Sequence, residues 1–179
     1  STRAITTSRI DLTWNAINGA TYQVDRESSL AGGFVQIAMP MTNSFSDTGL
    51  QPTTAAYIYR VRAVNGAGTS PNSSPRLSTT VVYTDNALAA GILIKAMHLA
   101  ELRSAVNAAR ALAVLGAAGF TDAAAPGTIV KAVHIAELRT ALDDALSKLS
   151  FSTGGYTNGA LNGVVIKAVH FQELRDRME

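Results

Sequence analysis

Three histidines are the side chains best suited to chemistry in this sequence, and they recur at one spacing. His98, His134 and His170 lie 36 residues apart, and the chain of 179 residues has no other histidine. Three neutral imidazoles that converge would make a metal site with an open position for water. A second interpretation is structural, with each ring bonded to the backbone of its own or the next repeat. A third places a bound ligand at the junctions between repeats.

Each histidine belongs to a longer motif, Lys-Ala-x-His-x-x-Glu-Leu-Arg. A lysine in the first turn of a helix opposes the helix dipole, so we expect a loop carboxylate or an anionic ligand to compensate it. The alternative is a lysine whose ammonium group extends into solvent. The candidate ligand-binding residues are therefore the motif lysines and the acidic residues of the preceding loops: Lys95, Lys131, Lys167, Asp85 and Asp122.

The motif is part of a repeated unit with a loop and a helix. An aromatic residue, a threonine and an aspartate or asparagine begin each unit, and a glycine stands four residues before the motif lysine. In the first copy, residues 94–115 contain no glycine or proline and are rich in alanine and leucine, which predicts a helix that stops at Gly116. Such fixed-period repeats bury their apolar faces against one another.

A helical projection of the motif predicts how the three helices pack. Leucines lie at the centre of the apolar face, with the motif histidine and lysine on the same face, so we expect the helices to meet around an approximate threefold axis. Glutamate and arginine flank this face and are expected to pair with neighbouring helices, as flanking charges do in coiled coils. These structural residues are Leu102, Leu138, Leu174, Glu101, Arg103, Glu137, Arg139, Glu173 and Arg175.

The first 83 residues have a different pattern. Short segments alternate apolar and polar residues at period two, the longest at 57–64, and turn sequences such as Asn18-Gly19 separate them. This pattern predicts an antiparallel β-sandwich. The predicted architecture is thus multidomain β + α: a sandwich at 1–83, then an all-α domain at 84–179 with repeats at 84–120, 121–156 and 157–179.

The sandwich segment resembles a fibronectin type III domain. The resemblance rests on Leu50-Gln51-Pro52 leading to Tyr57, on Val61-Arg62-Ala63-Val64-Asn65, and on Trp14 in an early strand. It implies that Tyr57 is a corner tyrosine whose hydroxyl bonds nearby backbone, and that Trp14 is a core residue between the sheets. Domains of this family serve as spacers, adhesion modules or binding surfaces, and the fold does not choose among these roles.

The repeats carry two further resemblances. Their loop, glycine and helix start are loosely similar to S-layer homology modules, which come in threes and bind cell-wall glycans. They are more similar to the Lys-Ala-Val-His and Glu-Leu-Arg repeats found near the C-termini of predicted extracellular proteins of soil bacteria. The resemblance implies a secreted or cell-surface location and upstream domains in the same polypeptide.

Composition excludes several classes of function. The chain has no cysteine, so disulfides and thiolate metal sites are excluded. A net charge of +2 does not predict a nucleic-acid partner, and no apolar run is long enough for membrane insertion. No catalytic triad, phosphate loop or pair of catalytic carboxylates stands out, and no cofactor is implied.

These observations predict a non-catalytic accessory region of an exported bacterial protein. Its expected role is a spacer with a binding or anchoring module, for cell-surface glycan or another surface protein. One alternative is the metal site at the three histidines. A second alternative is a purely structural stalk or assembly interface.

Overall fold

A computed structural model describes residues 1–85, 87–89 and 91–179 of the chain. Its first part contains eight strands within these described residues: β1 (Thr2–Thr6), β2 (Arg9–Thr13), β3 (Thr21–Glu27), β4 (Phe34–Ala38), β5 (Ser44–Thr48), β6 (Ala56–Asn65), β7 (Gly68–Thr69) and β8 (Arg76–Thr79). Three helices follow: α1 (Ala96–Leu112), α2 (Ala132–Lys148) and α3 (Ala168–Asp176).

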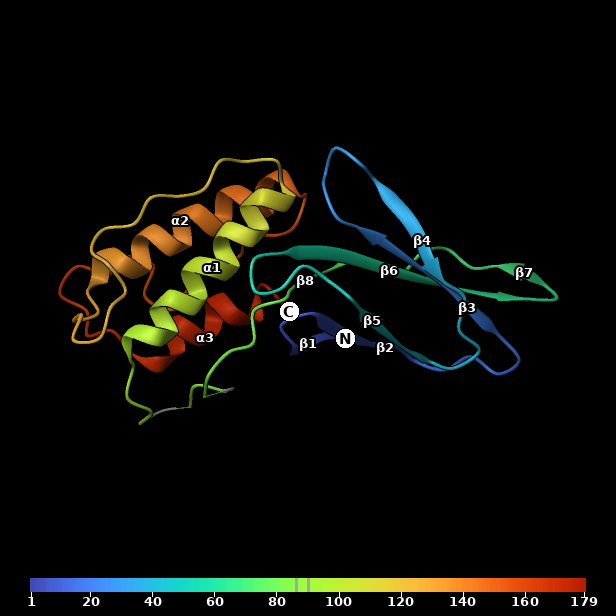
Figure 1. Cartoon of the computed structure of the whole chain (residues 1–179), viewed down its shortest axis with the longest axis horizontal. Coiled ribbons are helices and arrows are strands. Elements are labelled where there is room, and N and C mark those ends of the chain that lie inside the picture. Colours follow the sequence, from blue (N-terminus) through green and yellow to red (C-terminus); the bar gives the residue numbers. More distant parts are fainter. Residues whose placement is uncertain (86, 90) are drawn as a thin grey trace.

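The strands form two antiparallel sheets that face each other. One sheet has the order β1-β2-β5, and the other has the order β4-β3-β6-β7 with β8 also paired to β6. Alternation along β2 and β3 directs Ile10, Leu12 and Val24 into the space between the sheets, where all three are buried. The predicted antiparallel sandwich is confirmed, and the arrangement resembles a fibronectin type III domain (Figure 1).

Two aromatic residues of the sandwich take different positions. Tyr57 is buried near the start of β6, and its hydroxyl accepts a hydrogen bond from the backbone N–H of Gln51 at 3.3 Å. This is the geometry of a corner tyrosine. Trp14 follows β2 at the margin of the core, where it is partly exposed and packs edge-on against Tyr22 with ring centroids 5.2 Å apart. Trp14 therefore covers the end of the core rather than filling its centre.

Helix α1 is shorter than the predicted span of 94–115. Lys95 has extended backbone angles and is the N-cap, and the helix ends at Leu112. Val114 adopts a left-handed conformation with φ of 58°. The N–H of Leu115 bonds the carbonyl of Arg110, and the N–H of Val114 bonds that of Ala111. These two bonds form a Schellman motif, which closes the helix four residues before Gly116.

One hydrophobic cluster joins the helices to the sandwich. It contains Ile58 of β6, Leu77 of β8 and Leu99 of α1 together with the buried faces of α2 and α3. Backbone also crosses the junction, because the N–H of Leu30 bonds the carbonyl of Leu112 at 2.8 Å. No described helix is long and apolar enough to cross a membrane.

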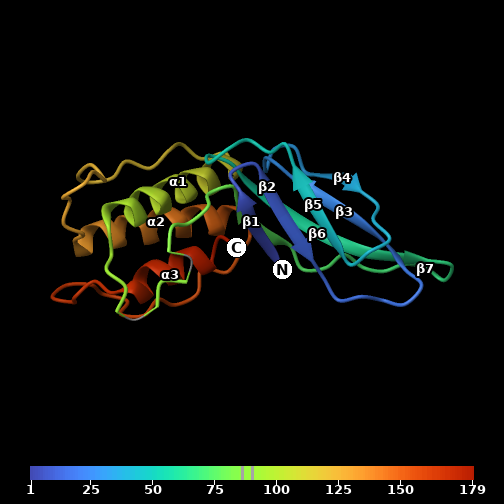
Figure 2. The same ribbon diagram turned by 60° about the horizontal axis from the view of Figure 1, so that its bottom comes forward.

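The helices point their C-terminal ends toward the sandwich and their N-terminal ends away from it (Figures 1 and 2). The repeat loops gather at this far end, which we call the tip of the molecule. Both ends of the chain lie at the junction instead, where Arg3 and Glu179 line one shallow hollow.

Candidate functional site

Each motif histidine caps the start of its own helix. It occupies the third helical position, and its Nδ1 atom accepts the backbone N–H of the motif lysine: Lys95 to His98 at 3.2 Å, Lys131 to His134 at 3.2 Å and Lys167 to His170 at 3.1 Å. The side chain of glutamate or glutamine usually plays this part in a capping box. In return, the N–H of each histidine donates to the lysine carbonyl.

This bond fixes the tautomer of the imidazole. A backbone N–H can only donate, so Nδ1 must carry a lone pair and the ring proton of the neutral form sits on Nε2. In the first two repeats Nε2 faces a carboxylate oxygen, that of Asp85 at 3.2 Å from His98 and that of Asp122 at 3.3 Å from His134. In the third repeat it faces the amide oxygen of Asn158, at 3.2 Å from His170.

The structure gives no support to the predicted three-histidine metal site. Both ring nitrogens of each histidine are engaged within its own repeat, and all three rings are fully buried. Over the described ranges, no group of three or more histidine, aspartate and glutamate side chains could hold a metal ion.

The motif lysines lie outside the helical core, contrary to the prediction that they share its inner face. The Lys95 and Lys131 side chains are 47 % and 56 % exposed, because the N-cap backbone is extended and a helical projection does not apply to it. Their ammonium groups pair with the loop carboxylates, Lys95 with Asp85 at 2.9 Å and Lys131 with Asp122 at 2.7 Å. The pKa of both aspartates lies below its usual value. The main cause is the hydrogen bond from the lysine, and the hydrogen bond with the histidine acts in the same direction.

The acidic or amide residue of each loop also meets a backbone requirement. Asp85, Asp122 and Asn158 have φ values of 50°, 57° and 53°. Aspartate and asparagine adopt this left-handed conformation more readily than other residues with a side chain. The same residue therefore turns the loop and presents an oxygen to the histidine.

Each motif glutamate holds the loop of its own repeat. The carboxylate accepts the backbone N–H of the loop threonine, that of Thr84 to Glu101 at 3.0 Å and that of Thr157 to Glu173 at 2.9 Å. Glu137 accepts both the backbone N–H and the hydroxyl of Thr121. A charged acceptor makes these hydrogen bonds stronger than neutral ones.

Each motif arginine holds the loop of a different repeat. Arg103 donates to the carbonyls of Thr121 and Asp122, at 2.6 and 2.7 Å. Arg139 donates to those of Thr157 and Asn158, both at 2.8 Å, and Arg175 to those of Thr84 and Asp85, both at 3.1 Å. The arginine of the first repeat thus holds the loop of the second, that of the second holds the loop of the third, and that of the third holds the loop of the first.

The arginines also stack on the aromatic residue that opens each loop. The guanidinium carbon lies 5.0 Å from the ring centroid for Arg103 on Phe120, and 4.5 Å for both Arg139 on Tyr156 and Arg175 on Tyr83. Arg175 is almost completely buried, and this burial lowers the pKa of its guanidinium. Tyr83, which the predicted boundary at 83 assigns to the sandwich, also serves the helical part.

Glutamate and arginine approach each other at two of the junctions. Arg175 lies 3.1 Å from Glu101, and Arg139 lies 3.5 Å from Glu173. These two ion pairs join different repeats, as we expected, and the same side chains also bond loop backbone groups. The motif leucines Leu102, Leu138 and Leu174 are fully buried in one cluster, and the threefold relation among their helices stays a prediction.

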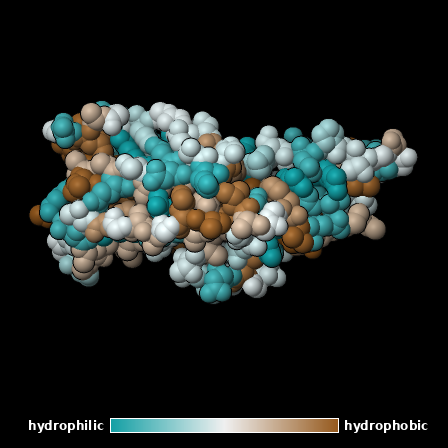
Figure 3. Space-filling model, turned by 90° about the horizontal axis from the view of Figure 1, so that it is seen from above, coloured by the Kyte–Doolittle hydropathy of each residue, from teal (hydrophilic) through white to brown (hydrophobic). Residues whose placement is uncertain are grey.

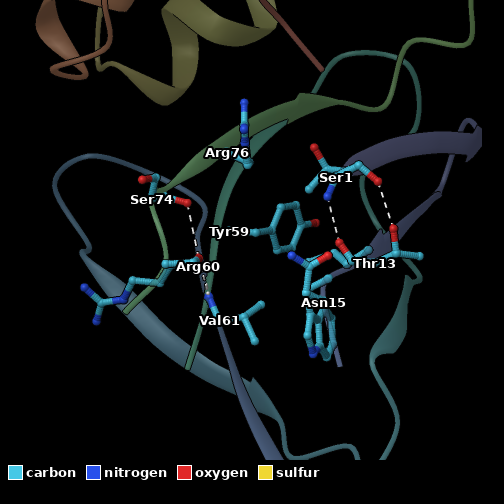
Figure 4. Close-up of a pocket in the computed structure, with 12 residues that line it drawn as sticks. Ser1, Thr13, Asn15, Tyr59, Arg60, Val61, Ser74 and Arg76 are labelled. Carbon is cyan, nitrogen blue, oxygen red and sulfur yellow. Dashed lines mark hydrogen bonds between the residues drawn. The ribbon is translucent and has the colours of Figure 1, made fainter. Parts of the chain in front are cut away.

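A hollow of about 360 Å³ opens in the sandwich, beside the start of β1 and the strand β8 (Figure 4). Some of its polar groups bond other residues of the sandwich, whereas Thr2 Oγ1 and Trp14 Nε1 are buried without a hydrogen-bond partner among the described residues. The amino group of Ser1 donates to the carbonyl of Thr13 at 2.7 Å, the N–H of Val61 donates to Ser73 Oγ at 3.1 Å, and the Tyr59 hydroxyl donates to Asp47 at 2.8 Å.

A second hollow, of about 780 Å³, lies at the tip and draws its lining from all three repeats. Aliphatic side chains dominate it: Ile92, Leu93, Ile129, Val130, Ile166 and Val169. Two of its lining residues, Leu93 and Ile129, are each 77 % exposed, and Val165, at the equivalent position of the third repeat, is 74 % exposed. In Figure 3, brown hydrophobic residues are visible at the left end of the molecule, which is the tip.

Our sequence reasoning missed these tip residues, although a signal for them existed. An apolar residue recurs two positions after each repeat glycine and again two positions after each motif lysine, as Met97, Val133 and Val169 show. The first position precedes the helix, and a helical projection places the second off the leucine face. This repetition is the signal from which the exposed apolar residues of the tip could have been predicted.

Comparison with known proteins extends to the sandwich only. No protein-family model matches the sequence, and no curated protein matches it. Among solved structures, fibronectin type III domains match about half of the chain. A fibronectin-like protein from Clostridium thermocellum is 32 % identical, over 40 % of this chain and 75 % of that one, with a TM-score of 0.35.

A second such structure is the sixth fibronectin type III domain of human fibronectin type III domain containing protein 3. It is 18 % identical and covers 49 % of this chain and 85 % of that one, with a TM-score of 0.39.

Proposed function

We propose that the chain is a non-catalytic module in which a sandwich spacer presents a helical head whose tip binds a partner. The single observation that carries this proposal is the collection of exposed aliphatic side chains from all three repeats at the tip. Apolar side chains that gather on one face, rather than standing singly, often mark an interaction site.

The fixed junction supports the spacer role. Ile58 and Leu77 of the sandwich share one apolar cluster with Leu99 of α1, so the head is packed onto the sandwich rather than tethered by a flexible linker. The fibronectin-like sandwich belongs to a fold that generally serves as a structural or binding module. We propose an exported, cell-surface location for the module on the basis of the repeat resemblance.

A glycan is no longer the favoured partner of the head. Sugar sites commonly use an exposed aromatic ring as a stacking surface, whereas Tyr83, Phe120 and Tyr156 each lie under an arginine. The tip hollow is lined by aliphatic groups instead. The resemblance to S-layer modules remains the sole support for a glycan, and a spacer without any ligand is the second candidate function.

The proposal is tested by retention of the fluorescently labelled chain on isolated bacterial cell envelopes. Leu93, Ile129 and Val165 are each changed to Gln in one variant, which should keep its helical circular dichroism because all three side chains are exposed. We expect retention of the natural sequence and loss of most of it in the variant. Equal retention of both would place binding elsewhere, and no retention of either would favour the spacer.

A further inference from the structure

The third repeat differs from the other two at one residue that changes the charge of the tip. Lys95 and Lys131 each pair with a loop aspartate, whereas the loop residue that corresponds to Asp85 and Asp122 is Asn158. Across the described residues, no carboxylate lies within ion-pair distance of Lys167, and residues 86 and 90 are an asparagine and an alanine. Lys167 is therefore an uncompensated cation.

Lys167 is also the one motif lysine among the described residues that line the tip hollow. The hollow thus combines an aliphatic lining from three repeats with a single lysine among its lining residues. Ala168 and Val169, the first two residues of α3, line it as well. The N–H groups of a first helical turn have no partner within the helix and add positive potential at the same place.

The other polar side chains of the hollow are committed to the protein. Gln172 accepts the N–H of Leu88 at 2.9 Å and donates to Asp176 at 2.6 Å. The Thr128 hydroxyl donates to the carbonyl of Ala123 at 2.8 Å and accepts the N–H of Ala125 at 3.3 Å. A peptide would need several free hydrogen-bonding groups for its backbone, and among these side chains the Lys167 ammonium group alone is uncommitted.

We propose that the tip hollow binds an aliphatic carboxylate, with the acyl chain on the aliphatic lining and the carboxylate on the Lys167 ammonium group. A volume of about 780 Å³ lies in the range of ligand sites, which are mostly apolar with a few polar groups that fix orientation. Burial of the chain supplies most of the affinity, and the charge-assisted hydrogen bond supplies selectivity for an anionic end. This inference rests on the proposed function of the tip.

Calorimetric titration of the full chain with decanoate tests the proposal, and decanol is the matched uncharged ligand. We expect decanoate to bind at least about tenfold more tightly than decanol, since a hydrogen bond between charged groups contributes roughly one factor of ten or more. Decylamine, which has the same chain and the opposite charge, should bind more weakly than decanol.

Three variants identify the lysine responsible. Lys167→Gln removes the charge, and Asn158→Asp restores the carboxylate that the other repeats place beside their lysines, so each should lower decanoate affinity about tenfold. Lys131→Gln is the control, because Lys131 does not line the hollow, and it should leave the affinity unchanged. Asn158→Asp recreates the loop residue of the first two repeats, so we expect this variant to fold. It keeps the test valid even if the Lys167→Gln variant does not fold.

Two outcomes would overturn the inference. One is a titration in which decanoate does not bind, or binds no better than decanol. The other is equal decanoate affinity in the natural sequence, Lys167→Gln and Asn158→Asp. Envelope retention that still depends on Leu93, Ile129 and Val165 would then show that the tip binds a partner of another class, so the two proposals fail separately.

Discussion

The motif histidines act through their lone pair rather than through reactivity. Each ring accepts a backbone N–H at Nδ1, a bond that exists only while the ring is neutral, because protonation would place a second proton at that atom. The stability of a helix start that is capped in this way depends on pH. A glutamine at the same position would make the same hydrogen bond without titrating.

His170, in the third repeat, should show this dependence. The pKa of His170 is lowered from its ordinary value of 6.5, first by burial and then by the charges of Arg139 and Lys167, with Glu173 acting in the opposite direction. The unfolded chain therefore binds a proton more readily than the folded chain. The contribution of His170 is complete above about pH 6.5 and is lost as the pH falls below that value.

We predict that the urea midpoint of the natural sequence falls between pH 7.5 and pH 5, and that His170→Gln reduces this fall. Gln can accept the Lys167 N–H without titrating, so the variant should lose little stability at pH 7.5. Asp85 and Asp122 do not affect this comparison. Their pKa is 3.8 in the unfolded chain and lower in the folded chain, so their contribution to stability changes with pH only below the range from pH 5 to pH 7.5. An unchanged pH slope in the variant would contradict the assignment.

A second residue carries backbone strain. Val114 has φ of 58° and is 60 % exposed at the end of α1, where a β-branched side chain is unfavourable and contributes little packing. We predict that Val114→Gly stabilises the protein by about 1 kcal/mol, as measured by chemical denaturation. Ser150→Gly, at the equivalent position after α2 with φ of 62°, is the control and should give a smaller gain. Destabilisation by Val114→Gly would show that its side chain packs in solution.

At the scale of elements, the repeat motif attaches helices to loops. Glutamate binds the loop of its own repeat and arginine binds the loop of another, so each loop is held from two helices. The arginine of the third repeat returns to the loop of the first, so these contacts link the three repeats in turn. The contacts therefore define a closed set, unlike an extended solenoid with two open ends.

We predict a graded loss of stability when the three arginines are replaced by Met. Arg175→Met should cost about 3 kcal/mol or more, because it leaves two loop carbonyls and Glu101 without their buried partner. Arg139→Met should cost somewhat less, and Arg103→Met about 1 kcal/mol, since Arg103 is more accessible to water. Guanidinium denaturation monitored at 222 nm measures the order, and equal costs for all three would contradict it.

Elements and packing faces could be predicted from the sequence, but the partners of the polar residues could not. Period-two and period-3.6 patterns located the sandwich, the helices and the buried leucines, because apolar burial leaves a direct trace in sequence. A helical projection placed Lys95 on the inner face, since it cannot show that the helix begins one residue later. The projection also could not reveal that Arg103 binds the carbonyls of Thr121 and Asp122, because this contact depends on the path of a loop.

For the whole molecule, the junction makes the sandwich and the helices one structural unit. Leu77 of β8 is buried in the cluster that contains Leu99 of α1, so each part covers apolar surface of the other. Burial shared in this way couples the unfolding of the two parts. The composition shift near residue 83 indicated two domains but carried no information about this shared surface.

We predict that the two parts unfold together. Trp14 is the single tryptophan and reports on the sandwich by fluorescence, whereas ellipticity at 222 nm reports mainly on the helices. Both signals should change at one denaturant concentration. Leu77→Ala should lower both midpoints equally, by a free energy of about 3 kcal/mol. Separate midpoints in the natural sequence would show that the junction is too weak to couple the parts.

The return of Arg175 to the first loop has a consequence for protein synthesis. The contacts of Arg175 with Asp85 and Thr84 span 90 and 91 residues of sequence, and they involve one of the last residues of the chain. A nascent chain that still lacks residue 175 can form α1 and α2 but leaves the first loop without its buried cation. We therefore expect the head to complete its fold only after residue 175 has emerged from the ribosome, while the sandwich can form its sheets earlier.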